Sequence, residues 1–548
     1  MTAGPRPGRL RSLAAGFGTA DLRRVQAGWA LSSVGNWGLM VVLSIYAFDR
    51  GGAPAVGLAA GLRLLPAAVA APAASSFVDR HARRDVVVWC SILRAACLSA
   101  TALVVAAGGP LGVVLVLAAA FSIVATAHKP AQSAMLASLA RTPQQLAAAN
   151  AVLSAIDSGG FLVGALAGGA LSALTSPQAA FGAVAAAFVA AAFAQHRVTR
   201  DARPPAGAAR DLAGEAATGL KAIAGSPQLR LVVGGFAAAT VVEGATDVVI
   251  VLIALDVLGL GQSGVGYLNA AWGAGGLIGG AAAAALLGRG RLALALTGGC
   301  IAIGACLAGL GAWSGTAVAL ALLTVLGVGY AVVEIAETTL LQRLIPDETL
   351  GRAFGVVESV YVAATGIGSL LAPLLVSALG IRGTLAVLGA ALALLALGLW
   401  PRLAGFEAAA PVGEREFGLL RGVPFLAPLA LATVENLAQR ATSVPMGDGE
   451  TIVCQGDVGD RFYVIADGEV EVFQDGTWMR RSADGDFFGE IALILDVPRT
   501  ATVVATRPGM LLAVERGDFL AAVIAQPRCS EAAGAVIRER WRGAGLVG

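Results

Sequence analysis

The sequence predicts an all-α polytopic membrane protein of about twelve transmembrane helices in two six-helix halves, followed by a small α+β domain, a β-roll with flanking helices. Three observations support this prediction. Of the 548 residues, 57% are hydrophobic and 14% are charged, which is unlike water-soluble globular chains. Apolar runs of spanning length follow one another from residue 25 to residue 402. Beyond Pro401 the apolar runs are short and alternate with polar residues, as strands require.

The first segment, residues 1–24, is expected to be a cytoplasmic tail. Arg6, Arg9 and Arg11 lie among glycines and prolines, without an apolar core that leads to a small-residue cleavage site. A cleaved secretory signal needs both of these features. We therefore expect a tail that is retained.

Two groups of apolar runs follow this tail. The first group forms an N-terminal half at 25–196 and the second a C-terminal half at 229–403, with a cytoplasmic central loop at 197–228. Parallel halves of this kind, with a substrate cavity between them, are typical of one large class of secondary transporters. The expected spans are 27–49, 53–77, 86–107, 110–132, 147–173, 177–196, 229–258, 262–287, 292–312, 315–341, 351–379 and 383–401.

The arginines predict the orientation of these spans. One set of alternate connections is rich in arginine, whereas the opposite set has little beyond Arg50 and Arg382. Cytoplasmic connections carry the excess of positive charge. We therefore expect a multi-pass protein of the plasma membrane with both termini in the cytoplasm. The arginine-rich connections contain Arg23, Arg24, Arg80, Arg83, Arg84, Arg141, the stretch from Arg197 to Arg230, Arg289, Arg291, Arg343 and Arg352.

The connection at residues 75–84 has the sequence Ser-Ser-Phe-Val-Asp-Arg-His-Ala-Arg-Arg. It resembles the Gly-x-Leu-Ala-Asp-Arg-x-Gly-Arg-Arg loop of the major facilitator superfamily, although Ser75 and Ala82 replace the two glycines. The resemblance implies a secondary transporter whose loop changes conformation during transport. The loop residues that match are Asp79, Arg80, Arg83 and Arg84.

A second resemblance concerns the branch of this superfamily. Arg94 and the segments 146–150 and 352–355 are similar to the drug and siderophore exporters. This similarity implies export of a small amphipathic solute, although uptake is an alternative.

Ionisable residues within the apolar runs are candidates for proton coupling or substrate binding, because they are costly inside a membrane. Glu243 and Asp247 are four residues apart and share one helical face. The chain has no Gly-x-x-x-x-Gly-Lys-Ser/Thr motif, so proton coupling is expected instead of ATP hydrolysis. Structural ion pairs with Arg63 or Arg94 are the alternative for these acids. The further candidates are Glu334, Glu337, Asp157 and Arg94.

The final part of the chain is expected to fold as a separate domain. Residues 404–424 are charged and contain glycine and proline, as a linker does, and the domain itself is expected at 425–548. An amphipathic helix at 429–440 is followed by short strands with Asp-Gly and Gly-Asp turn signals. Helical character returns at 515–541. This pattern predicts a β-roll between helices.

The segment 485–493, Gly-Asp-Phe-Phe-Gly-Glu-Ile-Ala-Leu, and the segment 499–502, Arg-Thr-Ala-Thr, closely resemble the phosphate-binding cassette of cyclic-nucleotide-binding domains. Residues 456–470 match the same family. The resemblance implies that Arg499 pairs with the cyclic phosphate and Glu490 with the ribose 2′-hydroxyl. Cyclic AMP is the favoured ligand, and cyclic GMP is compatible with Thr500. The implied contact residues are Gly489, Glu490, Ile491, Ala492, Leu493, Arg499, Thr500 and Ala501.

Together these features predict a proton-coupled exporter, with lipid, protons, a small solute and a cyclic nucleotide as its partners. The alternative from another class is a membrane-anchored nucleotide receptor that no longer transports. An enzyme is not expected, because His81, His128 and His196 are scattered. Neither a metal site nor nucleic-acid binding is expected, since no Cys-x-x-Cys spacing and no basic footprint occur. The oligomeric state stays open.

Overall fold

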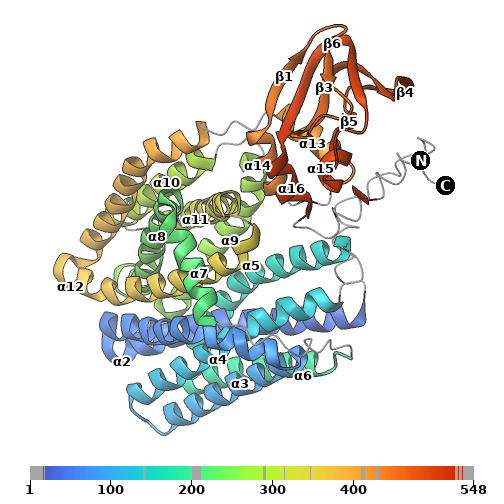
Figure 1. Cartoon of the computed structure of the whole chain (residues 1–548). Coiled ribbons are helices and arrows are strands. Elements are labelled where there is room, and N and C mark those ends of the chain that lie inside the picture. The colour runs from blue at the N-terminus through green and yellow to red at the C-terminus, as the bar shows by residue number, and fades with distance from the viewer. Residues whose placement is uncertain are drawn as a thin grey trace. The chain divides into compact units, whose positions relative to one another are not determined.

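The computed structural model describes residues 17, 19–139, 143–199, 212–287, 292–313, 315–345, 347–408, 414–427, 429, 431–524, 529 and 533–534. The chain divides into two compact units, Met1–Ala404 and Gly405–Gly548. The first unit consists of helices, and the second combines a sheet with short helices (Figure 1).

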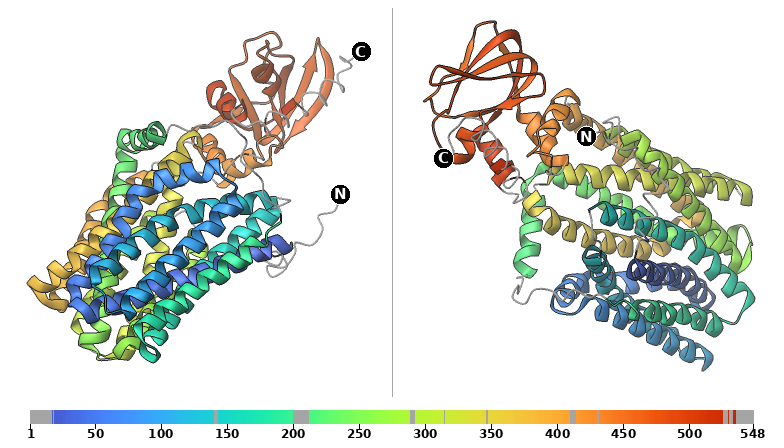
Figure 2. Two further views of the ribbon diagram at one scale, coloured as in Figure 1. Left: turned by 90° about the horizontal axis from the view of Figure 1, so that it is seen from below. Right: turned by 90° about the vertical axis from the view of Figure 1, so that its right-hand side faces the viewer.

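The helices of the first unit lie side by side as a bundle (Figure 2). Among the described residues, nine helices are long and apolar enough to cross a bilayer. The expected number of about twelve spans stays a prediction. The helices are α2 (Ala20–Arg80), α3 (Arg83–Ala106), α4 (Leu111–Leu139), α5 (Pro143–Leu174), α6 (Pro177–His196), α7 (Leu212–Gly225), α8 (Pro227–Leu252), the π-helical turn η1 (Ile253–Val257), α9 (Gly261–Leu287), α10 (Leu292–Ala312), α11 (Thr316–Leu344) and α12 (Asp347–Ala408).

The two longest helices, α2 and α12, are each interrupted by glycine. Gly51 and Gly52 have non-helical backbone angles within α2, and Gly380 does so within α12. Gly52 has φ 60° and Gly380 has φ 69°, values that glycine adopts without the steric cost of a Cβ atom. Each long helix therefore contains two stretches, and the interruptions fall where the sequence analysis expected connections between spans.

The expected central loop at 197–228 contains the helix α7. Residues 200–211 of this loop lie outside the described residues, as do residues 1–16 of the expected tail. In α7, a Cβ atom on Gly219 would lie 2.5 Å from the Arg352 carbonyl oxygen. The helix therefore packs closely against the beginning of α12.

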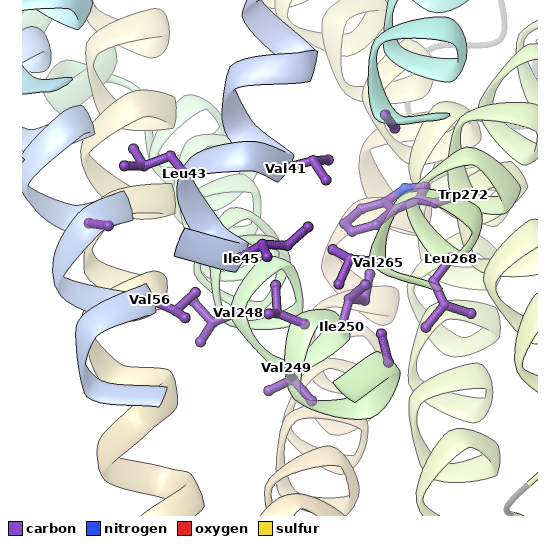
Figure 3. Close-up of a cluster of buried hydrophobic side chains, with 14 of the residues drawn as sticks. Val41, Leu43, Ile45, Val56, Val248, Val249, Ile250, Val265, Leu268 and Trp272 are labelled. Carbon is purple, nitrogen blue, oxygen red and sulfur yellow. The ribbon is translucent and has the colours of Figure 1, made fainter. Parts of the chain in front are cut away.

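Buried apolar side chains join helices from both expected halves (Figure 3). Ile45 and Val56 come from α2, Val248 and Ile250 from α8, and Trp272 from α9, and all are at most 6% exposed. Dispersion contacts of this kind drive helix association in lipid, which provides little hydrophobic effect between helices.

Glycines allow α8 and α12 to approach closely. A Cβ atom on Gly244 would lie 2.0 Å from the Thr365 carbonyl oxygen, and one on Gly368 would lie 2.0 Å from that of Val241. Small residues permit such approaches between membrane helices. The position of α8, which carries Glu243 and Asp247, therefore depends on these glycines.

Replacing Gly244 with alanine is expected to destabilise the bundle by about 1–3 kcal/mol, because overpacking forces the backbone apart. The apparent melting temperature of the purified protein measures the effect. Gly234→Ala on the same helix is the control, because a Cβ atom there meets nothing within 4 Å. Equal melting temperatures for the two variants would contradict the packing argument.

The second unit is built on one antiparallel sheet with the strand order β1-β6-β3-β4, to which β2 is added at β6 and β5 at β3. Two clusters of buried apolar residues lie in this unit. Its elements are α13 (Glu414–Gly422), α14 (Leu431–Arg440), β1 (Thr442–Met446), β2 (Thr451–Val453), β3 (Arg461–Gln474), β4 (Thr477–Ala483), β5 (Phe487–Phe488), α15 (Glu490–Leu495), β6 (Thr502–Glu515) and α16 (Arg516–Ile524).

The stretch expected to be a linker, 404–424, is partly folded into the second unit. It contains α13, and Leu420 and Val423 at its end are fully buried in the core of this unit. The Arg415 guanidinium also donates to the Ala466 carbonyl oxygen at 2.9 Å. At the other end, α16 covers only part of the expected helical segment 515–541, most of whose remainder lies outside the described residues.

Candidate functional sites

The second unit contains a tight turn at Gly489. Strand β5 pairs with β3 through Tyr463 and Phe488, after which the chain enters α15. Gly489 has φ 88°, and a Cβ atom there would lie 2.6 Å from Arg499 Nη1 and 3.1 Å from the Arg461 carbonyl oxygen. Only glycine fits both the left-handed backbone and the nearby guanidinium.

The guanidinium of Arg499 lies beneath this turn and is 4% exposed. Its Nη1 donates to the Gly489 carbonyl oxygen at 3.2 Å, and its Nη2 donates to the Arg461 carbonyl oxygen at 2.8 Å. Nη2 also forms an ion pair with Asp460 at 3.1 Å. A guanidinium has five N–H donors, so these bonds leave capacity for the oxygens of an anion. The arrangement is a fixed, buried cation.

The backbone and one aromatic ring hold this cation in place. The Arg499 N–H donates to the Asp457 carbonyl oxygen at 2.8 Å, and the Arg499 carbonyl accepts from Gly456 at 2.9 Å. The Tyr463 ring centroid lies 5.8 Å from the guanidinium carbon. Burial, followed by the charge of Asp460, raises the pKa of the Tyr463 phenol, so this side chain is neutral near pH 7.

The structure places the other expected contact residues around the same turn. Glu490 is 1% exposed at the start of α15. Ala492 and Leu493 are buried, and Leu493 belongs to the apolar core, whereas Ile491, Thr500 and Ala501 are half-buried. The sequence analysis missed Asp460 and Tyr463 as partners of Arg499. Both lie in the matched segment 456–470, but their contact with Arg499 arises only when β3 and the cassette meet.

Replacing Gly489 with alanine is expected to weaken nucleotide binding about tenfold, because a left-handed alanine costs about 1–2 kcal/mol and its methyl group displaces the guanidinium. Calorimetric titration with cyclic AMP measures the change. Gly517→Ala serves as the control, since a Cβ atom there meets nothing within 4 Å. An affinity within twofold of the unmodified protein for Gly489→Ala would contradict the assigned role of this turn.

The candidate acids of the bundle have different partners. The Tyr361 hydroxyl donates to Glu243 Oε1 at 3.2 Å, and the Tyr361 ring stacks on Phe236 at 5.8 Å. Asp247, one turn further along α8, lines a cavity together with Arg63 of α2. Glu243 is therefore hydrogen-bonded to a hydroxyl group of α12, whereas Asp247 shares a cavity with an arginine of α2.

The remaining candidates lie on α3, α5 and α11 and have different surroundings. On α11, Glu334 is exposed whereas Glu337 is 2% exposed. Asp157 Oδ1 accepts a hydrogen bond of 2.6 Å from Trp29 Nε1. Arg94 donates to Asn36 at 3.1 Å, and its guanidinium contacts the rings of Phe121 and Phe188, whose centroids are 4.4 and 4.1 Å away. These contacts make Arg94 part of the packing of the first half.

The connection at residues 75–84, after the second expected span, contains arginines that donate to backbone carbonyl groups. Arg83 donates to the Ala134 carbonyl oxygen at 3.0 Å, and Arg84 donates to that of Val198 at 3.3 Å. Arg80 is exposed, and the side chain of Asp79 lies outside the described residues. The loop therefore ties α3 to α4 and to the end of α6.

Among the described residues, long apolar helices that carry ionisable side chains are typical of a multi-pass membrane protein, and the second unit adds a buried cation. The chain belongs to the Major Facilitator Superfamily, which matches residues 27–361. The cyclic nucleotide-binding domain family matches residues 444–525. These matches confirm the expected fold class and support a cyclic nucleotide as the ligand. They point to a transporter and not to an enzyme.

Three similar proteins each match between 13% and 25% of the chain. The chain is 48% identical over 71 residues to a cAMP-dependent protein kinase regulatory subunit of Yarrowia lipolytica, which covers 13% of this chain and 19% of that protein. The chain thus spans about a fifth of the length of this curated relative. The solved structure "Sp-2Cl-cAMPS bound to PKAR CBD2" is 23% identical, with a TM-score of 0.23, 25% of this chain covered and 97% of the other. The Thermus thermophilus catabolite activator protein is 30% identical, with a TM-score of 0.21 and coverages of 22% and 60%.

Proposed function

We propose that the chain is a secondary active transporter that exports a small amphipathic solute in exchange for protons and is regulated by a cyclic nucleotide. The observation that carries the regulatory part is the buried Arg499 guanidinium beneath the Gly489 turn, which suits a singly charged cyclic phosphate. Cyclic AMP is favoured, because the 48% identical relative is named for its dependence on cAMP.

The transport part of the proposal is supported by the acids of α8. Glu243 accepts a hydrogen bond from the Tyr361 hydroxyl, and Asp247 lines a cavity with Arg63. Acidic residues inside membrane helices are candidates for a functional role, because burying them there is costly. Export is the direction implied by the resemblance to the exporter branch, and uptake is the alternative. The arginine bias supports a cytoplasmic location for both termini and for the nucleotide-binding domain.

The proposal of regulation is tested by solute flux in proteoliposomes, with and without cyclic AMP. Flux through the intact protein is expected to change with nucleotide, whereas a chain truncated after Gly405 is expected to give the same flux in both conditions. A ligand shifts a conformational equilibrium only by the difference in its affinity for the two states. Nucleotide binding without any change of flux would remove the regulatory role, and nucleotide binding without any flux at all would favour the membrane-anchored receptor.

A further inference from the structure

A cavity lies within the second half of the bundle, among α8, α10, α11 and α12. The residues that line it come from the first half of α8 and α10 and from the second half of α11 and α12. It therefore lies toward the end of the bundle at which α8 and α10 begin. Its walls are mostly apolar, and the lining residues used below are Phe236, Leu296, Thr297, Glu337 and Leu399.

Two polar side chains interrupt this apolar wall. Glu337 is 2% exposed and Thr297 is 5% exposed. Neither carboxyl oxygen of Glu337 has a hydrogen-bond partner among the residues that the structure describes, and the Thr297 hydroxyl oxygen has none there either. Burying a charged carboxylate without a partner costs several kcal/mol. The cavity therefore presents three buried acceptor atoms that a ligand can satisfy.

The chemistry of these three acceptors indicates the ligand. A primary ammonium group has three N–H donors and no acceptor, which matches two carboxylate oxygens and one hydroxyl oxygen. A hydrogen bond between an ammonium and a carboxylate is charge-assisted and is about twice as strong as a neutral one. An alkyl chain attached to the ammonium would be stabilised further, because Phe236, Leu296 and Leu399 would remove its methylene groups from water.

We propose that this cavity binds a primary alkylammonium ion, with the ammonium on Glu337 and Thr297 and the alkyl chain along the apolar wall. The site goes beyond the proposed function, because neither nucleotide binding nor the acid pair Glu243 and Asp247 contributes to it. It assigns Glu337 a different role from that of Glu334, which lies on the same helix but is exposed.

The test is calorimetric titration of the intact protein in phosphatidylcholine nanodiscs with n-hexylammonium at pH 7, and with n-hexanol as the neutral probe of equal chain length. Saturable binding is expected for n-hexylammonium, with at least tenfold weaker affinity in Glu337→Gln. Glu358→Gln, which changes an exposed acid of α12, is expected to bind within twofold of the unmodified protein. No saturable binding to the unmodified protein, or equal affinity for n-hexanol, would overturn the proposal.

A second measurement on the unmodified protein makes the test independent of the folding of the variant. Dicyclohexylcarbodiimide adds to protonated carboxyl groups in apolar surroundings, and the modified residue is identified by mass spectrometry of peptides. n-Hexylammonium is expected to reduce labelling of Glu337 at least fivefold, whereas n-hexanol at the same concentration is not. If n-hexylammonium binds but labelling of Glu337 is unchanged, or is reduced equally by the alcohol, the ammonium does not lie on Glu337 and the assignment fails.

Discussion

Replacing Arg499 with alanine is expected to weaken cyclic nucleotide binding by about 3 kcal/mol, roughly a hundredfold or more. The guanidinium is 4% exposed and is held by two carbonyl groups and by Asp460. Its loss leaves the phosphate of the ligand without its buried, charged partner. Calorimetric titration of the purified protein with cyclic AMP and cyclic GMP measures the change.

Two further variants separate the binding role of Arg499 from a general loss of charge. Arg507 is a half-exposed arginine of the same unit that pairs with Asp484 at 3.1 Å, and Arg507→Ala is expected to bind nucleotide as the unmodified protein does. Glu490→Gln is expected to weaken binding less than Arg499→Ala, because a hydrogen bond without a full charge remains. If Arg499→Ala keeps its affinity while its thermal unfolding is unchanged, the site assignment is wrong.

Neutralising the acid pair of α8 is expected to abolish transport that is driven by a pH gradient. Glu243→Gln keeps the shape of the side chain and its acceptor oxygen for the Tyr361 hydroxyl, but it cannot exchange a proton. Asp247→Asn removes the carboxyl group from the cavity that Asp247 lines together with Arg63. Both variants are expected to lose solute accumulation, while their affinity for cyclic AMP is unchanged, because the nucleotide site lies in the other unit.

This prediction is measured in proteoliposomes with an imposed pH gradient and a solute found by screening amphipathic compounds. Asp256→Asn provides the matched control, since Asp256 is an exposed acid of η1, directly after α8. It is expected to transport at the rate of the unmodified protein. Normal rates with an unchanged pH dependence in both Glu243→Gln and Asp247→Asn would make these residues structural, and Glu334 or Glu337 would become the next candidate for proton coupling.

Features that depend on local sequence could be predicted well. The interruptions of α2 at Gly51–Gly52 and of α12 at Gly380 lie at the connections that the apolar runs indicated, because span length follows from the thickness of the bilayer. The cassette glycine at 489 likewise has the left-handed backbone that a tight turn before a helix requires. The helices α7 and α13 were not predicted, since short helices depend on the surface against which they pack.

By itself, the sequence determined the class of the protein. Its composition and the length of its apolar runs indicate a bundle of membrane helices, and the residues of the phosphate-binding cassette indicate a pocket for an anion. Only the tertiary structure decided which charged groups meet. It placed Asp460 beside Arg499 and Tyr361 beside Glu243, and it placed Arg63 and Asp247 in the wall of one cavity. It also buried Glu337 in the wall of a second, mostly apolar cavity. The physical reason is that the preference of an apolar run for the membrane depends on its own residues alone, so it can be predicted from the sequence. Hydrogen bonds and ion pairs join residues that are far apart in the chain, and they depend on short distances that exist only after packing.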